Sequence, residues 1–155
     1  MGSAMAPSMT PPAAAPAFLA AAGWGDADIL PLAGDASFRR YFRVVAPDRR
    51  AVLMDAPAPH EDPRPFLAVA EYLVRHGFSA PRTLAADLGS GLVLLEDFGD
   101  ARMREVLDAA PERESRIYAD AVDLLAELHR KSAAPVPAYD MREYQREAGL
   151  LVDWY

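Results

Sequence analysis

The segment Leu32-Ala33-Gly34-Asp35-Ala36-Ser37-Phe38-Arg39-Arg40-Tyr41-Phe42-Arg43-Val44 decides the fold. Its first half, 33–37, is made of small and turn-forming residues, and an apolar run over 29–32 precedes it. Its second half alternates, with Arg40 and Phe42 on one face of a strand and Arg39 and Arg43 on the other. The pattern predicts two antiparallel strands, 29–32 and 38–45, joined by a tight turn.

The next segment predicts a third strand and then a helix. Turn-forming residues lead into a strand over 51–55. The helix spans 63–76, because Asp62 is a good N-cap and Pro63 suits the first helical position, where an N–H is not needed. Gly77 is expected to end the helix in a left-handed conformation.

The remaining elements complete a mixed fold. Two further strands are predicted around a Gly-Ser-Gly turn, and the chain then becomes helical. We expect an α+β fold, a five-stranded antiparallel sheet with one inserted helix, followed by helices. The predicted segments are 82–87 and 91–96 for the strands and 101–109, 113–131 and 141–155 for the helices.

Composition divides the chain into three parts. Residues 1–15 are Ala, Pro, Ser and Met without periodicity, which predicts a disordered leader. Residues 16–99, beginning with a short Ala-rich helix, form the lobe with the sheet, and 100–155 form a helical part. The apolar stretch Leu150–Tyr155 closes the sequence with no partner segment after it, so we expect a truncated helical part and possible association through this patch.

Composition also excludes several functions. The chain has 155 residues, 52% hydrophobic content, a net charge of −7 and no Cys. The absence of Cys excludes a disulfide scaffold, a thiolate metal site and a Cys nucleophile, and the acidic balance argues against a nucleic-acid binder. No apolar run approaches the ~18 residues of a membrane span, and no basic residue precedes Arg39 as a signal peptide requires. We therefore expect a cytoplasmic protein without membrane contact.

Three phrases, in order, carry a family resemblance: the opening segment, Val52-Leu53-Met54-Asp55-Ala56-Pro57, and Leu94-Leu95-Glu96-Asp97-Phe98-Gly99-Asp100. Together they resemble the aminoglycoside-phosphotransferase-like family of protein-kinase-like enzymes over residues 16–155. They are most similar to the bacterial kinases that phosphorylate N-acetylmuramate and N-acetylglucosamine at the anomeric hydroxyl. The resemblance implies a kinase-like N-lobe followed by the first helices of the C-lobe.

The resemblance also implies partners. ATP would be the phosphoryl donor, Mg²⁺ would be required, and an amino sugar would be the acceptor in cell-wall recycling. Two alternatives stay open: a kinase of another small hydroxyl compound, such as an aminoglycoside or a choline-like acceptor, and a catalytically silent interaction module.

Each phrase suggests binding residues. Backbone N–H groups of the small turn would approach the nucleotide phosphates, with a hydroxyl from Ser37. Met54 occupies the position of the kinase lysine, so Arg40 or Arg43 is expected to replace that lysine, oriented by Glu71 on the inserted helix. The backbone after the fifth strand would bind the adenine edge. The candidate cofactor-binding residues are Gly34, Asp35, Ala36, Ser37, Arg39, Arg40, Arg43, Met54, Glu96, Asp97 and Phe98.

No catalytic or metal-binding residue is expected within this chain. Asp97-Phe98-Gly99 spells the metal-binding triplet of protein kinases but precedes the long helix, where that triplet does not occur. His129-Arg130-Lys131 resembles the catalytic-loop motif but carries Lys in place of the acid. The family's His-x-Asp-x-x-x-x-Asn loop requires an Asn, and the sequence contains none. We therefore expect this chain alone to be catalytically inactive, with Mg²⁺ ligands elsewhere.

Overall fold

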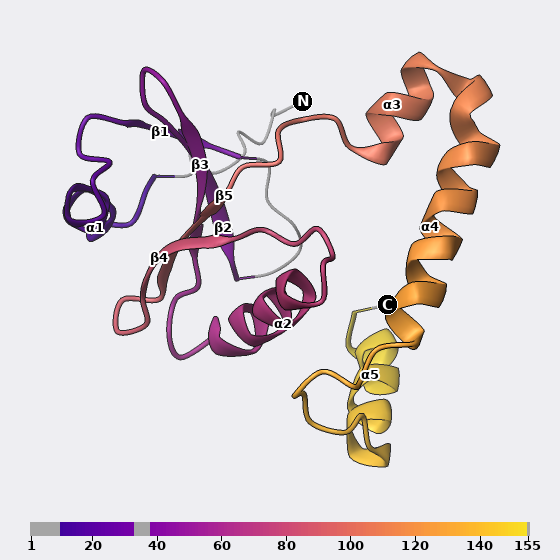
Figure 1. Ribbon diagram of the computed structural model, residues 1–155. Coiled ribbons are helices and arrows are strands. Elements are labelled where there is room, and N and C mark those ends of the chain that lie inside the picture. Colours follow the sequence, from indigo (N-terminus) through magenta and orange to yellow (C-terminus); the bar gives the residue numbers. More distant parts are fainter. Residues whose placement is uncertain (1–9, 33–37, 155) are drawn as a thin grey trace, which may run out of the picture.

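A five-stranded antiparallel sheet forms the body of the protein (Figure 1). The computed structural model describes residues 10–32 and 38–154, with side chains as far as residue 149. The strand order is β1-β2-β3-β5-β4, and the expected α+β fold is confirmed. The strands are β1 (Asp28–Pro31), β2 (Arg40–Val45), β3 (Arg50–Asp55), β4 (Thr83–Asp87) and β5 (Leu92–Glu96).

Helices cover both faces of the sheet and then form an arm beside it (Figure 1). The expected helices are present within one or two residues of their predicted ends, and a single turn of 3₁₀-helix, η1, joins α3 to α4. The helical elements are α1 (Ala15–Ala21), α2 (Arg64–Arg75), α3 (Met103–Ala109), η1 (Pro111–Arg113), α4 (Glu114–His129) and α5 (Met141–Trp154).

Strand alternation divides the core between the two faces. Phe42 and Val44 of β2 are fully buried in the cluster with α1 and Trp24. Tyr41, one position away, packs into the cluster on the α2 side with Met54. The alternation predicted for β2 is therefore confirmed, because successive side chains of a strand point to opposite faces.

The fifth strand lies in the interior of the sheet. β5 pairs with β3 on one side and with β4 on the other, and its residues Leu92–Leu95 are all buried. A continuous apolar run is what a strand covered on both faces requires. The local pattern predicted the strand, whereas its place between β3 and β4 depends on a pairing between segments some forty residues apart.

Helix α2 ends as its sequence predicts but begins one residue later than expected. Pro63, and not Asp62, is its N-cap residue and makes no side-chain cap hydrogen bond; the Asp62 carboxylate, one position earlier, accepts a hydrogen bond from the Arg64 amide (3.0 Å). At the other end Gly77 has a φ of +85°, and the Phe78 amide donates to the Leu73 carbonyl (2.9 Å). Both terminal contacts satisfy backbone groups that a helix end leaves without partners.

The ordered part begins before residue 16. Ala15 is fully buried, and Leu19 of the same helix packs beneath the sheet with Trp24. The Thr10 carbonyl accepts a hydrogen bond from Arg40 (3.2 Å). Residues 10–15 therefore belong to the fold, whereas the rest of the expected leader, 1–9, lies outside the described residues.

Gly91 marks the closest backbone approach in the sheet. Its φ is +72°, and a Cβ atom added there would lie 2.1 Å from the Ala56 carbonyl oxygen. The Ala56 amide in turn donates to the Gly91 carbonyl (2.9 Å). Only glycine fits this position, because it accepts a positive φ and has no side chain.

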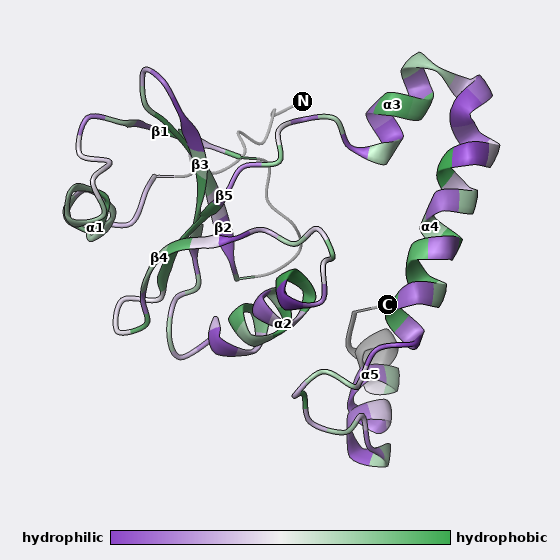
Figure 2. Cartoon of the chain, in the orientation of Figure 1, coloured by the Kyte–Doolittle hydropathy of each residue, from purple (hydrophilic) through white to green (hydrophobic). Residues whose placement is uncertain are grey.

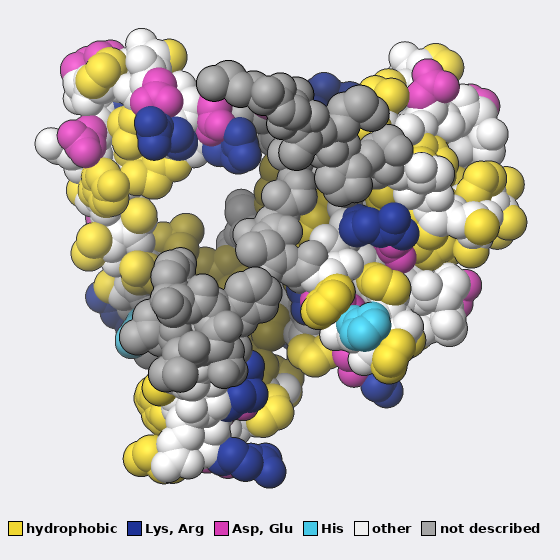
Figure 3. Space-filling model, turned by 180° about the vertical axis from the view of Figure 1, so that it is seen from behind, with side chains coloured by type: hydrophobic (Ala, Val, Ile, Leu, Met, Phe, Trp, Pro, Cys, Tyr) yellow, Lys and Arg dark blue, Asp and Glu magenta, His cyan; other side chains and the backbone are white. Residues whose placement is uncertain are grey.

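The α3–α5 arm has few contacts with the sheet. None of the described residues of α4 is buried, and its Leu124 and Leu125 side chains are half exposed. Figure 2 shows hydrophobic residues along the ribbon of this arm, and Figure 3 shows hydrophobic side chains on its surface. Contact with α2 comes through the Tyr72 hydroxyl, which donates to the Ser132 carbonyl. Among the residues described, no helix has the length and apolar character to cross a membrane.

Candidate nucleotide site

Two of the candidate arginines lie on opposite faces of the sheet. The Arg40 Nε and Nη2 atoms donate to Asp55 Oδ2 at 2.9 and 2.5 Å, directly across the β2–β3 ladder. This pair is on the α1 face, where the Asp55 carboxylate is buried. Arg43 is on the α2 face, opposite Val52. The alternation had predicted this division, so the two guanidinium groups do not share one ligand.

Arg43 contacts the segment that follows β5. Its Nη1 and Nη2 atoms donate to the two carboxylate oxygens of Asp100, at 3.0 and 2.8 Å. Its Nε atom lies 2.8 Å from Asp97 Oδ2, an ion pair without the alignment of a hydrogen bond. The hydrogen bond from Arg43 is the largest cause of the lowered pKa of Asp100. Arg43 therefore connects the middle of the sheet to the start of the helical arm.

Arg39 lies directly before the first residue of β2. Its Nε donates to Glu61 Oε2 (2.9 Å), and its neighbour Phe38 stacks on the His60 ring with centroids 4.7 Å apart. Burial lowers the pKa of Arg39, but the hydrogen bonds and charges of Glu61 and Tyr41 together outweigh it and the net shift of the pKa is upward. These two contacts attach the start of β2 to the loop between β3 and α2.

Gly34, Asp35, Ala36 and Ser37 lie outside the described residues. The strands that flank them are paired, with Pro31 opposite Phe42 and the Leu32 amide donating to the Tyr41 carbonyl (3.0 Å). The segment therefore connects two adjacent antiparallel strands. Its contact with phosphate stays a prediction.

Met54 and Glu71 have other surroundings than expected. Met54 has no exposed surface and packs among Val93, Leu95 and side chains of α2, so in this structure it is a core residue. Glu71 is exposed and pairs with Arg75 one turn along the same helix (2.9 Å). The expectation that Glu71 orients an arginine of β2 is therefore wrong for this structure.

The three hinge candidates differ in exposure. The Glu96 amide donates to the Arg82 carbonyl (2.9 Å), which ties the end of β5 to the residue before β4. Asp97 is almost completely buried, and its Oδ1 accepts the Gly99 amide (2.7 Å). Phe98 is 60% exposed. The segment thus has a fixed backbone with one outward-facing aromatic ring.

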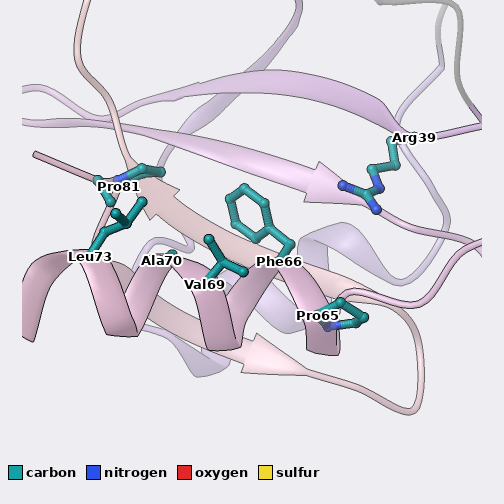
Figure 4. Close-up of a pocket in the computed structure, with 8 residues that line it drawn as sticks. Arg39, Pro65, Phe66, Val69, Ala70, Leu73 and Pro81 are labelled. Atoms are coloured by element: carbon teal, nitrogen blue, oxygen red, sulfur yellow. The ribbon is translucent and has the colours of Figure 1, made fainter. Parts of the chain in front are cut away.

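An apolar hollow follows the α2 face of the sheet. Figure 4 shows Phe66, Val69 and Leu73 of α2 pointing toward the strands, with Arg39 at one end of the hollow and Pro81 at the other. Its volume is about 370 Å³. The lining suits a flat apolar group. Among the lining residues, only Arg39 has a cationic side chain, and it lies at one end of the hollow.

The described residues offer no site for a metal ion. They contain no group of three or more His, Asp or Glu side chains arranged to hold a cation. Lys131, in the sequence His129-Arg130-Lys131, pairs with Glu127 (3.2 Å) and lies over the Phe78 ring at 5.7 Å. Lys131 therefore contacts Phe78, which follows α2, and the motif supplies no acid.

Comparison with known proteins decides the family. A model of the phosphotransferase enzyme family matches residues 28–155, from the first residue of β1 onward. The chain belongs to the phosphotransferase enzyme family. This agrees with the resemblance inferred from the three phrases.

Named relatives of this phosphotransferase chain are also similar over most of its length. It is 43% identical over 144 residues to the N-acetylmuramate/N-acetylglucosamine kinase of Pseudomonas aeruginosa, covering 90% of this chain and 42% of the relative. The proteins of the same name from Pseudomonas putida and Neisseria meningitidis are 36% and 31% identical, over 85% and 84% of this chain and 40% of each relative. The chain thus spans about two fifths of the length of these relatives.

Sequence reasoning missed the acidic partners of the arginines. Glu61 is 22 positions from Arg39, and Asp100 is 57 positions from Arg43. No local periodicity links residues so far apart. One signal was present: three arginines in or next to one strand of an acidic chain require nearby carboxylates.

Proposed function

We propose that this chain is the nucleotide-binding portion of an ATP-dependent kinase that phosphorylates an amino sugar. The observation that carries the proposal is 43% identity, over nine tenths of the chain, to a protein named N-acetylmuramate/N-acetylglucosamine kinase. Membership of the phosphotransferase family supports the reaction class. We infer that the acceptor is N-acetylmuramate or N-acetylglucosamine and the attacking group its anomeric hydroxyl.

The fold suggests how ATP would bind. The turn over 33–37 would place backbone N–H groups against the phosphates, as Gly-rich kinase loops do. Arg39 emerges beside that turn at the cationic end of the apolar hollow. The backbone of Glu96 to Phe98 would meet the purine edge. The buried Met54 is left out of the proposed contacts, and Arg40 is left out because it faces α1.

The described residues form no cluster of side chains that would hold a divalent metal ion. When bound, Mg²⁺ would neutralise charge on the transferring phosphoryl group. No carboxylate cluster among the described side chains suits it. We therefore place the metal ligands and the catalytic acid in sequence that the longer relatives have beyond the matched region. An ATP-using sugar kinase of cell-wall recycling would work in the cytoplasm.

Calorimetric titration of the 155-residue chain with ATP and Mg²⁺ tests the binding step. We expect saturable heat at millimolar ligand, since a dissociation constant of 1 mM corresponds to only about −4 kcal/mol. Arg39→Gln should weaken binding, and Arg116→Gln on the remote α4 should not. A folded chain that gives no heat at 10 mM ATP would contradict the proposal.

Phosphorus NMR with ATP and N-acetylmuramate tests the second part. We expect no sugar phosphate from this chain alone, because its sequence lacks the Asn of the family's catalytic loop. Formation of an anomeric phosphate would show that the inference of a missing catalytic loop is wrong. Turnover of an aminoglycoside or of choline in its place would overturn the proposed acceptor.

One observation favours the alternative of an interaction module. Tyr118, Val122, Leu124 and Leu125 expose half or more of their surface on α4. The expected patch Leu150–Tyr155 lies where side chains are not described. Sedimentation equilibrium of the chain distinguishes the two alternatives. Self-association together with no heat of ATP binding in the calorimeter supports the interaction module, and a monomer that binds ATP supports the kinase.

A further inference from the structure

We propose that Arg43 is a positioning residue for the purine, holding the backbone of the segment after β5 in its binding conformation, and that it is not a phosphate ligand. The inference rests on the proposed nucleotide site and assigns the role of one residue within it. We call Arg43, Asp97 and Asp100 the hinge clasp.

The clasp spans three adjacent strands of the sheet. Arg43 lies opposite Val52 of β3, which lies opposite Leu95 of β5. Strands are spaced about 4.8 Å apart, so the side chains of Arg43 and Asp97 together bridge backbones that are roughly 10 Å apart across β3. A long, forked side chain suits this distance, because it forms contacts with two carboxylates at once.

Every nitrogen of the Arg43 guanidinium lies within 3.4 Å of a carboxylate oxygen, Nη1 and Nη2 in hydrogen bonds and Nε in an ion pair alone. Nε lies 2.8 Å from Asp97 Oδ2, Nη1 lies 3.0 Å from Asp100 Oδ2, and Nη2 lies 2.8 Å from Asp100 Oδ1 and 3.4 Å from Asp97 Oδ1. A phosphate would have to displace two carboxylates that already neutralise the cation. Arg43 is 17% exposed and Asp97 4%, so the pair is shielded from solvent and from salt.

Asp97 connects the Arg43 side chain to the backbone of the segment after β5. The carboxylate that meets Arg43 also accepts the Gly99 amide at 2.7 Å. Gly99 has a φ of +77°, a left-handed conformation that favours glycine. Between the end of β5 and Gly99 lie the peptide groups proposed to meet the adenine edge. Loss of Arg43 would therefore release the segment that presents them.

The two roles predict different ligand dependence. A phosphate ligand contributes to ATP binding and nothing to adenosine binding. A residue that positions the hinge contributes equally to both, because both carry the same purine. The ratio of the two affinities is therefore the informative quantity, and it is not changed by a uniform loss of binding-competent protein.

The experiment titrates the full 155-residue chain with adenosine and with ATP, and follows backbone amides by NMR. Arg43→Gln should weaken both ligands by the same factor, leaving their affinity ratio unchanged. Without ligand, the amides of residues 97–100 should exchange with solvent about ten-fold faster or more, as expected when charge-assisted hydrogen bonds are lost. Arg116→Gln removes a solvent-exposed ion pair with Asp120 on α4 and is the matched control.

Several results would overturn the inference. Weakened ATP binding with unchanged adenosine binding would make Arg43 a phosphate ligand. Unchanged amide exchange at residues 97–100 in Arg43→Gln would show that the hinge clasp does not hold this segment, and would leave the proposed function intact. A wild-type chain that binds neither ligand would remove the proposed function and this inference together. If Arg43→Gln does not fold, Arg43→Lys replaces it: the charge stays, one carboxylate loses its partner, and exchange should rise to an intermediate rate.

Discussion

Replacement of Gly91 by alanine should destabilise the protein far more than the same change at other glycines of positive φ. The added Cβ would lie 2.1 Å from the Ala56 carbonyl oxygen and 3.0 Å from its carbon. Real Cβ atoms essentially never approach a backbone oxygen so closely, and both partners belong to the backbone. The start of β5 must therefore move away from the end of β3.

The size of the effect follows from three contributions. A non-glycine residue at φ +72° costs about 1–2 kcal/mol. Forcing the backbone apart in a packed sheet costs about 1–3 kcal/mol. Weakening the Ala56–Gly91 hydrogen bond (2.9 Å) costs about 0.5–1.5 kcal/mol. The sum, about 2.5–6.5 kcal/mol, is a large part of the roughly 5–15 kcal/mol that stabilises an ordinary domain.

Urea unfolding followed by tryptophan fluorescence and circular dichroism measures this change. Gly77→Ala is the matched control, because Gly77 has a φ of +85° and no atom within 4 Å of its added Cβ. It should cost only the conformational part, about 1–2 kcal/mol. The difference between the two variants isolates the close approach. Equal losses of stability in both would refute the reasoning.

Three further predictions concern side chains. Asp55→Ala should lower the unfolding free energy by about 1.5–3 kcal/mol in urea titrations, because a buried carboxylate that pairs with an arginine is lost; a loss below 0.5 kcal/mol would contradict this. Tyr72→Phe should speed proteolysis of the 132–139 linker, since the hydrogen bond to the Ser132 carbonyl disappears, and Tyr118→Phe should leave the rate unchanged. The lowered pKa of Asp100 means that its contribution to stability is present at neutral pH and is lost as pH falls below about 4. The gap between the melting curves of the wild type and Asp100→Asn should therefore narrow progressively as the pH is lowered from 7 to below 4; a gap that does not narrow would exclude this carboxylate as its cause.

Local patterns predicted the elements and the two faces of β2. Period-two alternation is a property of the strand itself, so the burial of Phe42 and the opposite directions of Arg40 and Arg43 were readable without a structure. The α2 helix was equally local, because the Asp62 contact at its start and its terminating Gly77 lie within the segment.

Contacts between distant segments could not be predicted from the sequence. The partner of Arg43 depends on β5 lying next to β3, which no local pattern encodes. Met54 was assigned a ligand role by analogy with a kinase lysine, whereas coverage of both sheet faces makes it part of the core. Burial on the α2 face follows from where that helix packs, and periodicity alone does not determine this.

The central place of β5 has a consequence for synthesis. Strands β1 to β3 form a contiguous unit that is complete once residue 55 has left the ribosome, whereas β5 ends at residue 96. At roughly 5–20 residues per second, the edge of β3 waits about 2–8 s for its partner. During that interval its apolar residues present an unpaired edge of the kind that recruits other chains. During the synthesis of α2 and β4, which lie between β3 and β5 in the sequence, the nascent protein is therefore most open to pairing with another chain.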